Sequence, residues 1–318
     1  MEKPDIPQNE KNRIEVLRSL NILDTQPDER FDRLTRMAKR LFGVPIALVS
    51  LVDENRQWFK SCIGLNVRET SRDISFCGHA ILGDGIFMIP DTTEDQRFAD
   101  NPLVTGNPNI RFYAGCPLSL NGYKLGTLCV IDQKPRSFEQ EDIEAMTDLA
   151  SMVERELEAI QLATLDELTH ISNRRGFVYL AQKSLNLCAR QKIPAALVFM
   201  DLDKFKPIND KYGHAEGDRA LIAFTGQMRS SFRNSDVFAR LGGDEFVVLL
   251  PNTSKQLAEK PIDQLNRSLT QYNQETNRGY DIAFSYGIVE FNPEQHPSID
   301  ELLANGDTLM YEAKSAKG

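Results

Sequence analysis

Two short stretches decide the fold of the second half of the chain. Residues 195–203 read Ala-Ala-Leu-Val-Phe-Met-Asp-Leu-Asp, in which a buried strand from Ala195 to Met200 ends abruptly in acidic residues. Residues 237–250 contain two more apolar strands, joined through Leu-Gly-Gly-Asp-Glu at 241–245. If these strands are neighbours in one sheet, their acidic ends meet at one edge.

Helices are expected on both sides of these strands. The pattern predicts a helix up to about residue 191, a loop that carries Lys206 to Asp218, and a helix from Ala220. A long polar helix over 254–275, a strand over 282–289 and a closing helix over 299–314 complete the order. This is a split βαβ arrangement, typical of an α+β domain.

The first half reads as another α+β unit, built on an antiparallel sheet. Two amphipathic helices separated by Pro27 come first. Asn121-Gly122 is a type I′ hairpin signal between the last two of five strand-like runs. These runs are 47–52, 57–62, 87–89, 113–120 and 124–131.

A helix over residues 139–165 is expected to connect the halves, with a capping box at Ser137 to Gln140. It could pack on a core with one amphipathic face, or pair with its own copy in a parallel dimer. We favour the dimer, because the stripe keeps a 3.5-residue period. The stripe consists of Ile143, Met146, Ala150, Val153, Leu157, Ile160 and Thr164.

Composition limits the classes of function. With 318 residues the chain is long enough for roughly two domains of about 150 residues. Its 37 basic and 46 acidic side chains give a net charge of -9, which disfavours a general grip on nucleic acid. We expect no membrane insertion and a cytoplasmic location. The five scattered cysteines predict buried, reduced thiols. Because the four histidines form no pair at the spacing of metal ligands, only a cation with oxygen ligands is considered.

The carboxylates at the strand ends carry the central chemical argument. Asp201, Asp244 and Glu245 would repel one another at one sheet edge unless a divalent cation lay among them, so they predict a Mg²⁺ site. The alternative is that they line a solvated loop. Gly242-Gly243 suits either a bare hairpin turn or a backbone that approaches a bulky anion.

Residues 206–218 hold candidates for nucleotide recognition. Lys206 can reach phosphate oxygens as a point charge. The Asp218 carboxylate can accept two hydrogen bonds from the N1 and N2 edge of guanine, and Asn209 offers both a donor and an acceptor. The alternative interpretation of Asn209 and Asp218 is ordinary turn and helix-cap chemistry.

Taken together, three segments resemble the GGDEF family of diguanylate cyclases over residues 162–318. They are Met200 to Asp218, Arg240-Leu-Gly-Gly-Asp-Glu-Phe246 and Asp307 to Lys314. The resemblance implies a palm-like antiparallel sheet with flanking helices, related to class III nucleotide cyclases. It also implies condensation of two GTP into cyclic di-GMP with release of pyrophosphate.

The resemblance also implies roles for individual residues. Asp201, the Leu202 carbonyl and Asp244 would ligate Mg²⁺ or Mn²⁺, with Asp244 the proton acceptor for the ribose 3′-hydroxyl and Glu245 a second acid. Asp218 would make the site prefer GTP over ATP. The remaining substrate contacts are Asn209 to guanine, Lys206 and Lys314 to phosphates, and the Gly242-Gly243 backbone.

Arg233-Asn-Ser-Asp236 stands at the family's RxxD position and resembles its inhibitory product site. Arg233 could stack on guanine and Asp236 could accept from its edge, while the alternative is an exposed turn ion pair. Family members usually continue past the closing lysine with Gly-Arg-Asn and a last strand, whereas the sequence given stops at Gly318. A shortened sequence is one explanation, and a lowered triphosphate affinity is the other outcome that the resemblance leaves open.

The first half, assigned here to residues 1–158 with its N-terminal helices, resembles a GAF sensor domain. Ile74 to Ile81, Arg111 to Leu118 and Leu125 to Asp132 carry the likeness, which indicates a fold and leaves the ligand unknown. Cys77-Gly78-His79 is compatible with a thiol-linked chromophore or a haem contact. A buried free thiol and a histidine that is hydrogen-bonded within the protein are the commoner interpretation.

The sequence therefore predicts a homodimeric diguanylate cyclase, paired through the 139–165 helix and regulated through its GAF domain. One alternative is a non-catalytic receptor that binds cyclic di-GMP at Arg233 and Asp236 and signals by contact. In a second alternative the GAF half is the functional sensor for a small molecule and the cyclase is its output.

Overall fold

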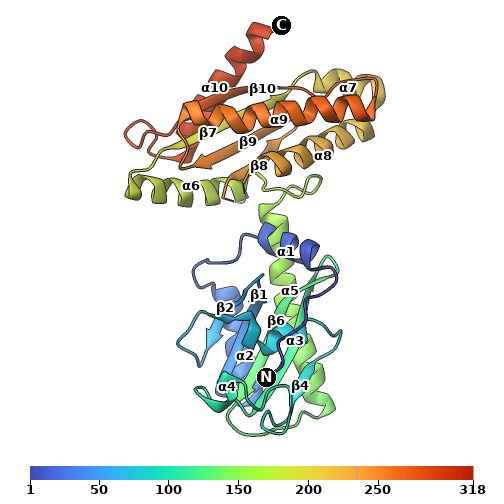
Figure 1. Ribbon diagram of the computed structural model, residues 1–318, viewed down its shortest axis with the longest axis vertical. Helices are drawn as coiled ribbons and strands as arrows, with labels where there is room; N and C mark the ends of the chain where they lie inside the picture. Colours follow the sequence, from blue (N-terminus) through green and yellow to red (C-terminus); the bar gives the residue numbers. More distant parts are fainter. Residues whose placement is uncertain (234, 318) are drawn as a thin grey trace. The chain divides into compact units, whose positions relative to one another are not determined.

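The computed structural model describes residues 1–233 and 235–317. It divides into two compact units, Met1–Gln161 and Leu162–Gly318, and helix α5 (Gln140–Thr164) runs from the first into the second (Figure 1). Asn234, inside the predicted product-site motif, lies outside the described residues. Among the helices of the described residues, none has both the length and the apolar character that a membrane crossing needs.

The first unit is built on a six-stranded antiparallel sheet with the order β3-β2-β1-β6-β5-β4. The expected α+β character and the predicted strands are confirmed. Asn121 and Gly122, with φ of 53° and 79°, turn β5 into β6 as the hairpin signal predicted. The strands are β1 (Ile46–Val52), β2 (Arg56–Ile63), β3 (Glu69–Ser71), β4 (Phe87–Ile89), β5 (Phe112–Leu120) and β6 (Tyr123–Asp132).

Helices cover both faces of this sheet. Alternation along β1 divides the core, because Ala47, Val49 and Leu51 face one cluster while Ile46 and Leu48 face another. The first face carries α1 (Glu10–Ser19), α2 (Glu29–Phe42) and α5. The second carries the short helices α3 (Phe76–Ala80) and α4 (Pro102–Thr105), beside the 3₁₀ turn Arg72–Ile74.

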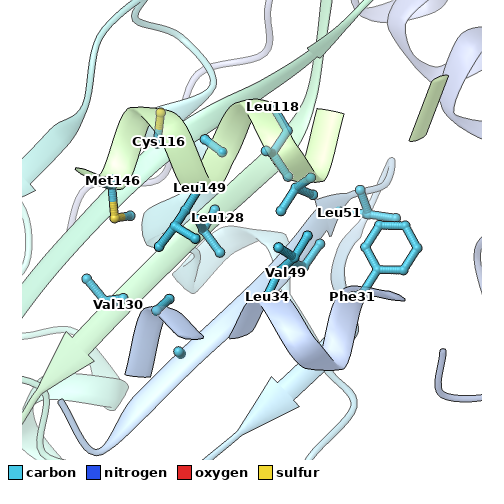
Figure 2. Packing of buried hydrophobic residues seen from close by; sticks show 14 of the residues in the cluster. Phe31, Leu34, Val49, Leu51, Cys116, Leu118, Leu128, Val130, Met146 and Leu149 are labelled. Atoms are coloured by element: carbon cyan, nitrogen blue, oxygen red, sulfur yellow. The ribbon is translucent and has the colours of Figure 1, made fainter. Parts of the chain in front are cut away.

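The apolar stripe of α5 is the main correction to the sequence analysis. Met146, Val153 and Leu157 are fully buried in the core of their own chain. Figure 2 shows Met146 beside Leu128 of β6. The prediction that this stripe forms a dimer seam is therefore wrong, and the packing alternative is confirmed. Periods of 3.5 and 3.6 differ by only about 20° per heptad, less than the width of an amphipathic face, so a helix of 25 residues cannot distinguish them.

The start of α5 also differs from the prediction. The helix begins at Gln140, three residues after Ser137, so the expected capping box does not form. Instead the backbone N–H of Glu139 donates to the Asp142 carboxylate at 3.0 Å. The Asp142 side chain, in the first helical turn, thus accepts from a backbone N–H that precedes the helix, the role expected of the Gln140 side chain.

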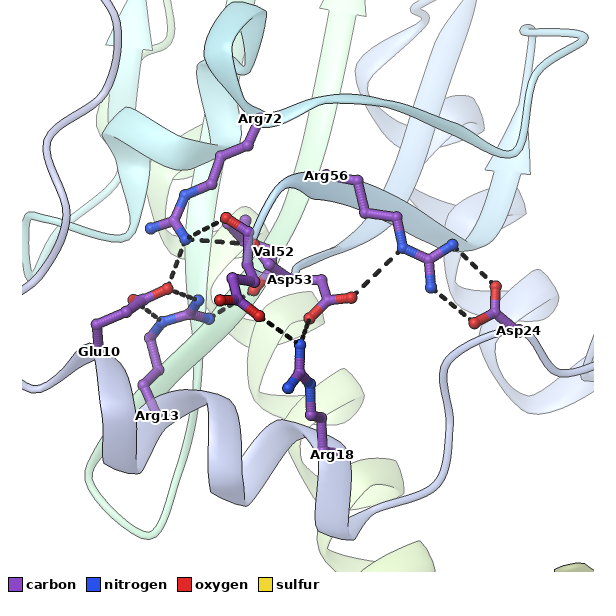
Figure 3. Close-up of polar contacts among 9 residues, drawn as sticks. Glu10, Arg13, Arg18, Asp24, Val52, Asp53, Arg56 and Arg72 are labelled. Carbon is purple, nitrogen blue, oxygen red and sulfur yellow. Dashed lines mark hydrogen bonds and ion pairs between the residues drawn. The ribbon is translucent and has the colours of Figure 1, made fainter. Parts of the chain in front are cut away.

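Helix α1 is fastened to the β1–β2 turn by a charge cluster that the sequence did not reveal (Figure 3). Arg13, only 1% exposed, donates to both oxygens of Glu10 at 2.7 and 2.8 Å and to the Val52 carbonyl at 2.6 Å. Arg72, also buried, pairs with the same carboxylate at 2.5 Å. Burial opposes the ionisation of Glu10, but these hydrogen bonds outweigh it and lower the pKa to about 2.

The second unit contains an antiparallel sheet in the order β10-β7-β9-β8, which confirms the split βαβ arrangement. Its strands are β7 (Ala195–Leu202), β8 (Val237–Gly242), β9 (Glu245–Pro251) and β10 (Phe284–Glu290). One face packs against α6 (Arg174–Gln191) and α10 (Ile299–Lys317). The other packs against α8 (His214–Ser231) and α9 (Lys255–Thr276).

The expected loop before Ala220 is helical, which corrects the sequence analysis. Helix α7 covers Phe205–Tyr212, and α8 begins at His214. Pro207 does not prevent the helix, because it lies in the first turn of α7, where a helix needs no donor N–H. Gly213, at φ 86°, separates the two helices.

Candidate active site

The predicted acidic residues meet at one end of the second sheet. β7 and β9 are paired neighbours, and Asp201 stands directly opposite Glu245 in their register. The backbone N–H of Leu202 donates to the Asp244 carbonyl at 3.1 Å. Because β8 turns into β9 between Gly242 and Glu245, Asp244 is held at the same end of the sheet.

Negative charge is poorly compensated among these acids. The Asp201 side chain is 13% exposed, and burial raises its pKa. Asp244 and Asp203 raise it further, against a hydrogen bond from Lys314 that lowers it. The pKa of Glu245 is also raised, first by burial and then by Asp307, Asp201 and Asp244. Each carboxylate thus makes the ionisation of its neighbour less favourable.

Lys314 of α10 pairs with this cluster, because its ammonium donates to Asp201 Oδ1. Burial lowers the pKa of Lys314, but the hydrogen bond and the charge of Asp201 outweigh it and raise the pKa. The sequence assigned Lys314 to a substrate phosphate. In the structure its ammonium is hydrogen-bonded to the Asp201 carboxylate, and a change of side-chain rotamer would let it contact a phosphate instead.

Three charged residues of the site were missed by the sequence analysis. Asp203 accepts a hydrogen bond from Ser285 Oγ at 2.7 Å and adds charge beside Asp201. Asp307 and Arg174 act on Glu245 in opposite directions, raising and lowering its pKa. A signal was available for Asp307, which precedes Lys314 by seven residues and so lies on the same side of α10.

The glycine pair forms an open hairpin turn. Gly242 and Gly243 have φ of 155° and 52°, and a Cβ on either would meet no atom within 4 Å. The predicted turn is confirmed, and the space above it would also let a bulky anion approach the backbone. Arg240 fixes the turn, since its Nε donates to the Gly243 carbonyl at 2.9 Å.

The same arginine connects the turn to the segment that follows α5. Arg240 Nη1 lies 3.1 Å from Asp166 Oδ1. Asp166 in turn accepts from the Thr169 N–H at 2.9 Å. Asn173, which caps α6, donates to the Leu165 carbonyl at 3.0 Å. A chain of polar contacts therefore runs from the end of α5 to the hairpin turn.

The predicted base-reading residues lie on adjacent helices. Asn209 is on α7, and Asp218 follows Gly217 on α8. A Cβ built on Gly217 would lie 2.0 Å from Asn209 Oδ1, so the amide of Asn209 rests directly on the glycine backbone. This contact brings Asn209 next to Asp218. Lys206 is exposed on α7, whose first residue follows the end of β7 by three.

Asp236 makes a turn contact at the predicted product site. Its carboxylate accepts from the backbone N–H of Arg233 at 2.8 Å, while the Arg233 side chain is exposed. Burial raises the pKa of Asp236, against the lowering effect of that hydrogen bond. The turn is held by this backbone contact and not by the side-chain ion pair of the alternative interpretation, and the exposed guanidinium can still meet a ligand.

Cys77 and His79 of α3 do not face one common site. The Cys77 thiol lies in the core, 3.9 Å from the sulfur of Cys129, whereas His79 Nε2 is 3.2 Å from the carbonyl oxygen of Glu2. A shared chromophore or haem contact does not fit this geometry. A separate pocket of about 510 Å³ lies beside α2 and β2, with Lys60, Arg36 and Asp32 in its lining.

The donor set of the acidic cluster fits a hard dication. Among the described residues, His, Cys, Asp and Glu side chains form no preformed group of three in a metal-binding arrangement. Asp201, Asp244 and the Leu202 carbonyl nevertheless offer oxygen donors, as Mg²⁺ and Mn²⁺ prefer. Burial and the neighbouring acids raise the pKa of Asp201 although Lys314 pairs with it. A dication bound together with substrate phosphates would add positive charge here.

Two family profiles match the chain. One, described as diguanylate cyclase, GGDEF domain, matches residues 163–318, and the other, described as GAF domain, matches residues 26–157. Among solved structures, the isolated GGDEF domain of TpbB (YfiN) from Pseudomonas aeruginosa is 34% identical with a TM-score of 0.44, and the match covers 48% of this chain and 89% of that one.

Two longer relatives come from Pseudomonas aeruginosa. A protein named cyclic di-GMP phosphodiesterase PA2567 is 42% identical over 84% of this chain and 46% of its own length. Diguanylate cyclase DgcP is 28% identical over 87% of this chain and 43% of its own. The chain thus spans less than half of either relative.

Proposed function

The chain belongs to the GGDEF family, with a GAF domain preceding its GGDEF domain, and on this premise we propose that it is a diguanylate cyclase. It would condense two GTP into cyclic di-GMP and release two pyrophosphates. One observation carries the proposal: Asp201, Asp244 and Glu245 are gathered at one sheet end, where two of them have raised pKa values. Such crowding is costly for stability and is typical of functional sites.

Phosphoryl transfer needs mainly positioning and charge stabilisation, which the residues of this site can supply. Mg²⁺ or Mn²⁺, held by Asp201, Asp244 and the Leu202 carbonyl, would neutralise charge on the triphosphate. The Asp244 carboxylate would accept the proton of the 3′-hydroxyl, with Glu245 as a second acid. Lys206 and Lys314 would hold phosphate oxygens beside the open Gly242-Gly243 turn.

Guanine would be read by Asn209 and Asp218. A carboxylate accepts from the paired N1 and N2 donors of guanine, and adenine lacks this edge. GTP is therefore the expected substrate. Incubation with equal GTP and ATP should yield mainly cyclic di-GMP by mass spectrometry, and a mixed or adenine dinucleotide as the main product would contradict the assignment.

Each GGDEF domain would hold one GTP, so two domains must face each other during condensation. This requirement is our reason to propose a homodimer. Since the inner stripe of α5 is buried in its own chain, pairing through this helix would have to use the opposite side, where Met152 and Leu162 are 40% and 68% exposed. Regulation by the GAF domain would then pass along α5 to Asp166 and Arg240.

The direct test is to incubate the purified chain with GTP and Mg²⁺ and to identify products by mass spectrometry. We expect cyclic di-GMP and pyrophosphate from the wild-type chain and neither from Asp244→Ala. A wild-type chain that binds GTP and Mg²⁺ yet forms no product would overturn the proposal. Because the substrate is GTP, we place the reaction in the cytoplasm.

The main alternative is a receptor that binds cyclic di-GMP without catalysis. The exposed Arg233 guanidinium beside Asp236 favours such binding, as a product-inhibition site or as the whole function. In a receptor, Asp244→Ala would spare binding and there would be no product to lose. The name of the 42% identical phosphodiesterase does not decide the matter, since more than half of that protein lies outside the match.

A further inference from the structure

A buried group of polar side chains lies in the GAF domain, away from the acidic cluster of the second unit. Cys77 of α3 and Cys129 of β6 are 2% and 0% exposed, and their sulfur atoms are 3.9 Å apart. The Tyr113 hydroxyl donates to the Cys77 sulfur at 3.4 Å. Tyr113 can reach across because residue 115, opposite Cys129 in the sheet, is glycine and leaves room for the phenol oxygen.

Two hydroxyl groups border this pair. Ser50 of β1 and Thr127 of β6 stand opposite each other in the register, and both are fully buried. Within the described residues, neither hydroxyl oxygen has a hydrogen-bond partner of good geometry. A buried hydroxyl without a partner costs stability, and valine would fill the place of Thr127 without that cost. Stability therefore does not explain these two residues.

Their effect falls on Cys77. Burial opposes ionisation of its thiol, but the contacts with Cys129 and Tyr113 outweigh burial and lower the pKa of Cys77. The Thr127 and Ser50 hydroxyls, which have no other partner among the described residues, lie near enough to donate to the sulfur once it is ionised, and they lower the pKa further. The pKa of Cys129 is raised by Cys77 and by burial, which makes Cys129 the proton-bearing partner. Cys116, in the neighbouring strand β5, has its pKa raised to about 11 by burial. The surroundings thus favour one thiolate among the cysteines of this sheet.

We propose that Cys77 and Cys129 are a redox-sensitive dithiol, which a small hydroperoxide oxidises to a disulfide within the GAF domain. The Cys77 thiolate attacks one peroxide oxygen, and the O–O bond breaks. The alkoxide or hydroxide that leaves takes up the proton that the Cys77 thiol lost on ionisation, so that alcohol or water departs. The Cys129 sulfur then attacks the Cys77 sulfenic acid, the S–O bond breaks, and water leaves with the Cys129 proton. Two thiols lose two electrons, and the peroxide gains them.

The small size of the oxidant is part of the proposal. Both sulfurs are buried, so the peroxide must enter through local opening, and α3 has only five residues to hold it in place. The two sulfurs must then approach from 3.9 Å to bonding distance, near 2.05 Å. Oxidation would therefore draw α3 toward β6.

The test needs no nucleotide, so it does not depend on the cyclase proposal. The reduced intact chain is treated with hydrogen peroxide, denatured, alkylated and mapped by mass spectrometry. We expect a Cys77–Cys129 linked peptide that dithiothreitol reverses, while Cys116 and Cys188 remain alkylated. Equal oxidation of Cys77 and Cys116, or a disulfide between other cysteines, would overturn the proposal.

Variants test the order of the steps. Cys129→Ser should leave a sulfenic acid on Cys77 that dimedone traps, whereas Cys77→Ser should protect Cys129 at least ten-fold. Thr127→Val, which keeps shape, should slow the oxidation of Cys77 several-fold. Cys116→Ser is the matched control and should change neither rate nor product. An unchanged rate in Thr127→Val together with rapid Cys129 oxidation in Cys77→Ser would contradict the mechanism.

Discussion

Two charge clusters, one in each unit, contain partly or fully buried carboxylates whose pKa values shift in opposite directions. In the first unit, Glu10 is enclosed by Arg13 and Arg72, and its pKa falls to about 2 (Figure 3). In the second unit, burial and the neighbouring acids raise the pKa values of Asp201 and Glu245, although Lys314 pairs with Asp201. A compensated cluster fastens a helix to a sheet. A cluster with more negative than positive charge is less stable, and a bound cation would stabilise it.

The largest effect should come from removing one acid of the second cluster. Asp244→Asn should lower cyclic di-GMP formation about a thousand-fold or more, since charge stabilisation and proton acceptance are both lost. The melting temperature of the second unit should stay the same or rise, because a repulsive charge has gone. Product assays and calorimetry together check this. A variant that melts much earlier would mean that Asp244 is structural.

The matching change in the first cluster should do the reverse. Glu10→Gln leaves two buried guanidinium groups without their shared carboxylate, which should destabilise the GAF unit by about 3 kcal/mol. Glu15→Gln, at an exposed position on the same helix, is the control and should cost little. Chemical denaturation measures both variants. Equal stability of the two would show that the Glu10 cluster contributes nothing.

The pH dependence should distinguish the clusters by sign. The folded pKa of Glu10 is below its unfolded value of 4.5, so its stabilisation is complete above pH 4.5 and is lost as the pH falls toward 2. Asp201 and Glu245 have raised pKa values, so their contribution declines as the pH rises through the raised values. The difference in unfolding free energy between wild type and Glu10→Gln should therefore be largest and constant above pH 4.5, and it should shrink as the pH falls toward 2.

A dication should stabilise only the acidic cluster of the second unit. Mn²⁺ at ten times its dissociation constant should add about 1.4 kcal/mol to the stability of the second unit by mass action. The unfolding transition of the first unit should not move, and Asp201→Asn should abolish the gain. Calorimetry of the intact chain reads both transitions. A shift of the first transition alone would place the metal elsewhere.

The smallest effect concerns the contact between the two base-reading helices. Gly217→Ala should displace Asn209, whose Oδ1 occupies the space of a Cβ, and raise the KM for GTP about five-fold. The same change favours helix by up to about 1 kcal/mol. Gly226→Ala in the same helix is the control, since its Cβ meets nothing. A KM that rises equally in both variants would exclude the Asn209 explanation.

Local patterns were enough to predict both sheets and the convergence of Asp201, Asp244 and Glu245. The hairpin at Asn121-Gly122 and the strand ends are encoded by neighbouring residues, so sequence reveals them. The sequence could not show whether the apolar stripe of α5 packs on its own domain or on a second copy, because both kinds of packing require the same apolar periodicity. The Asp166–Arg240 pair and the effect of Asp307 on Glu245 join distant segments, and for Asp307 the helical spacing to Lys314 was the only local signal. Asp203 was missed although it lies two residues from Asp201, because alternation along a strand does not reveal which charges act on each other.

The central claim is that Asp201 and Asp244 hold a dication against a bound triphosphate. Electron paramagnetic resonance titration of Mn²⁺ tests it directly, on the intact chain loaded with 3′-deoxyGTP, which cannot condense. We predict protein-bound Mn²⁺ in the wild-type chain and an affinity at least ten-fold weaker in Asp201→Asn and in Asp244→Asn. Mn²⁺ affinities that are the same in the wild-type chain and both variants would contradict the account.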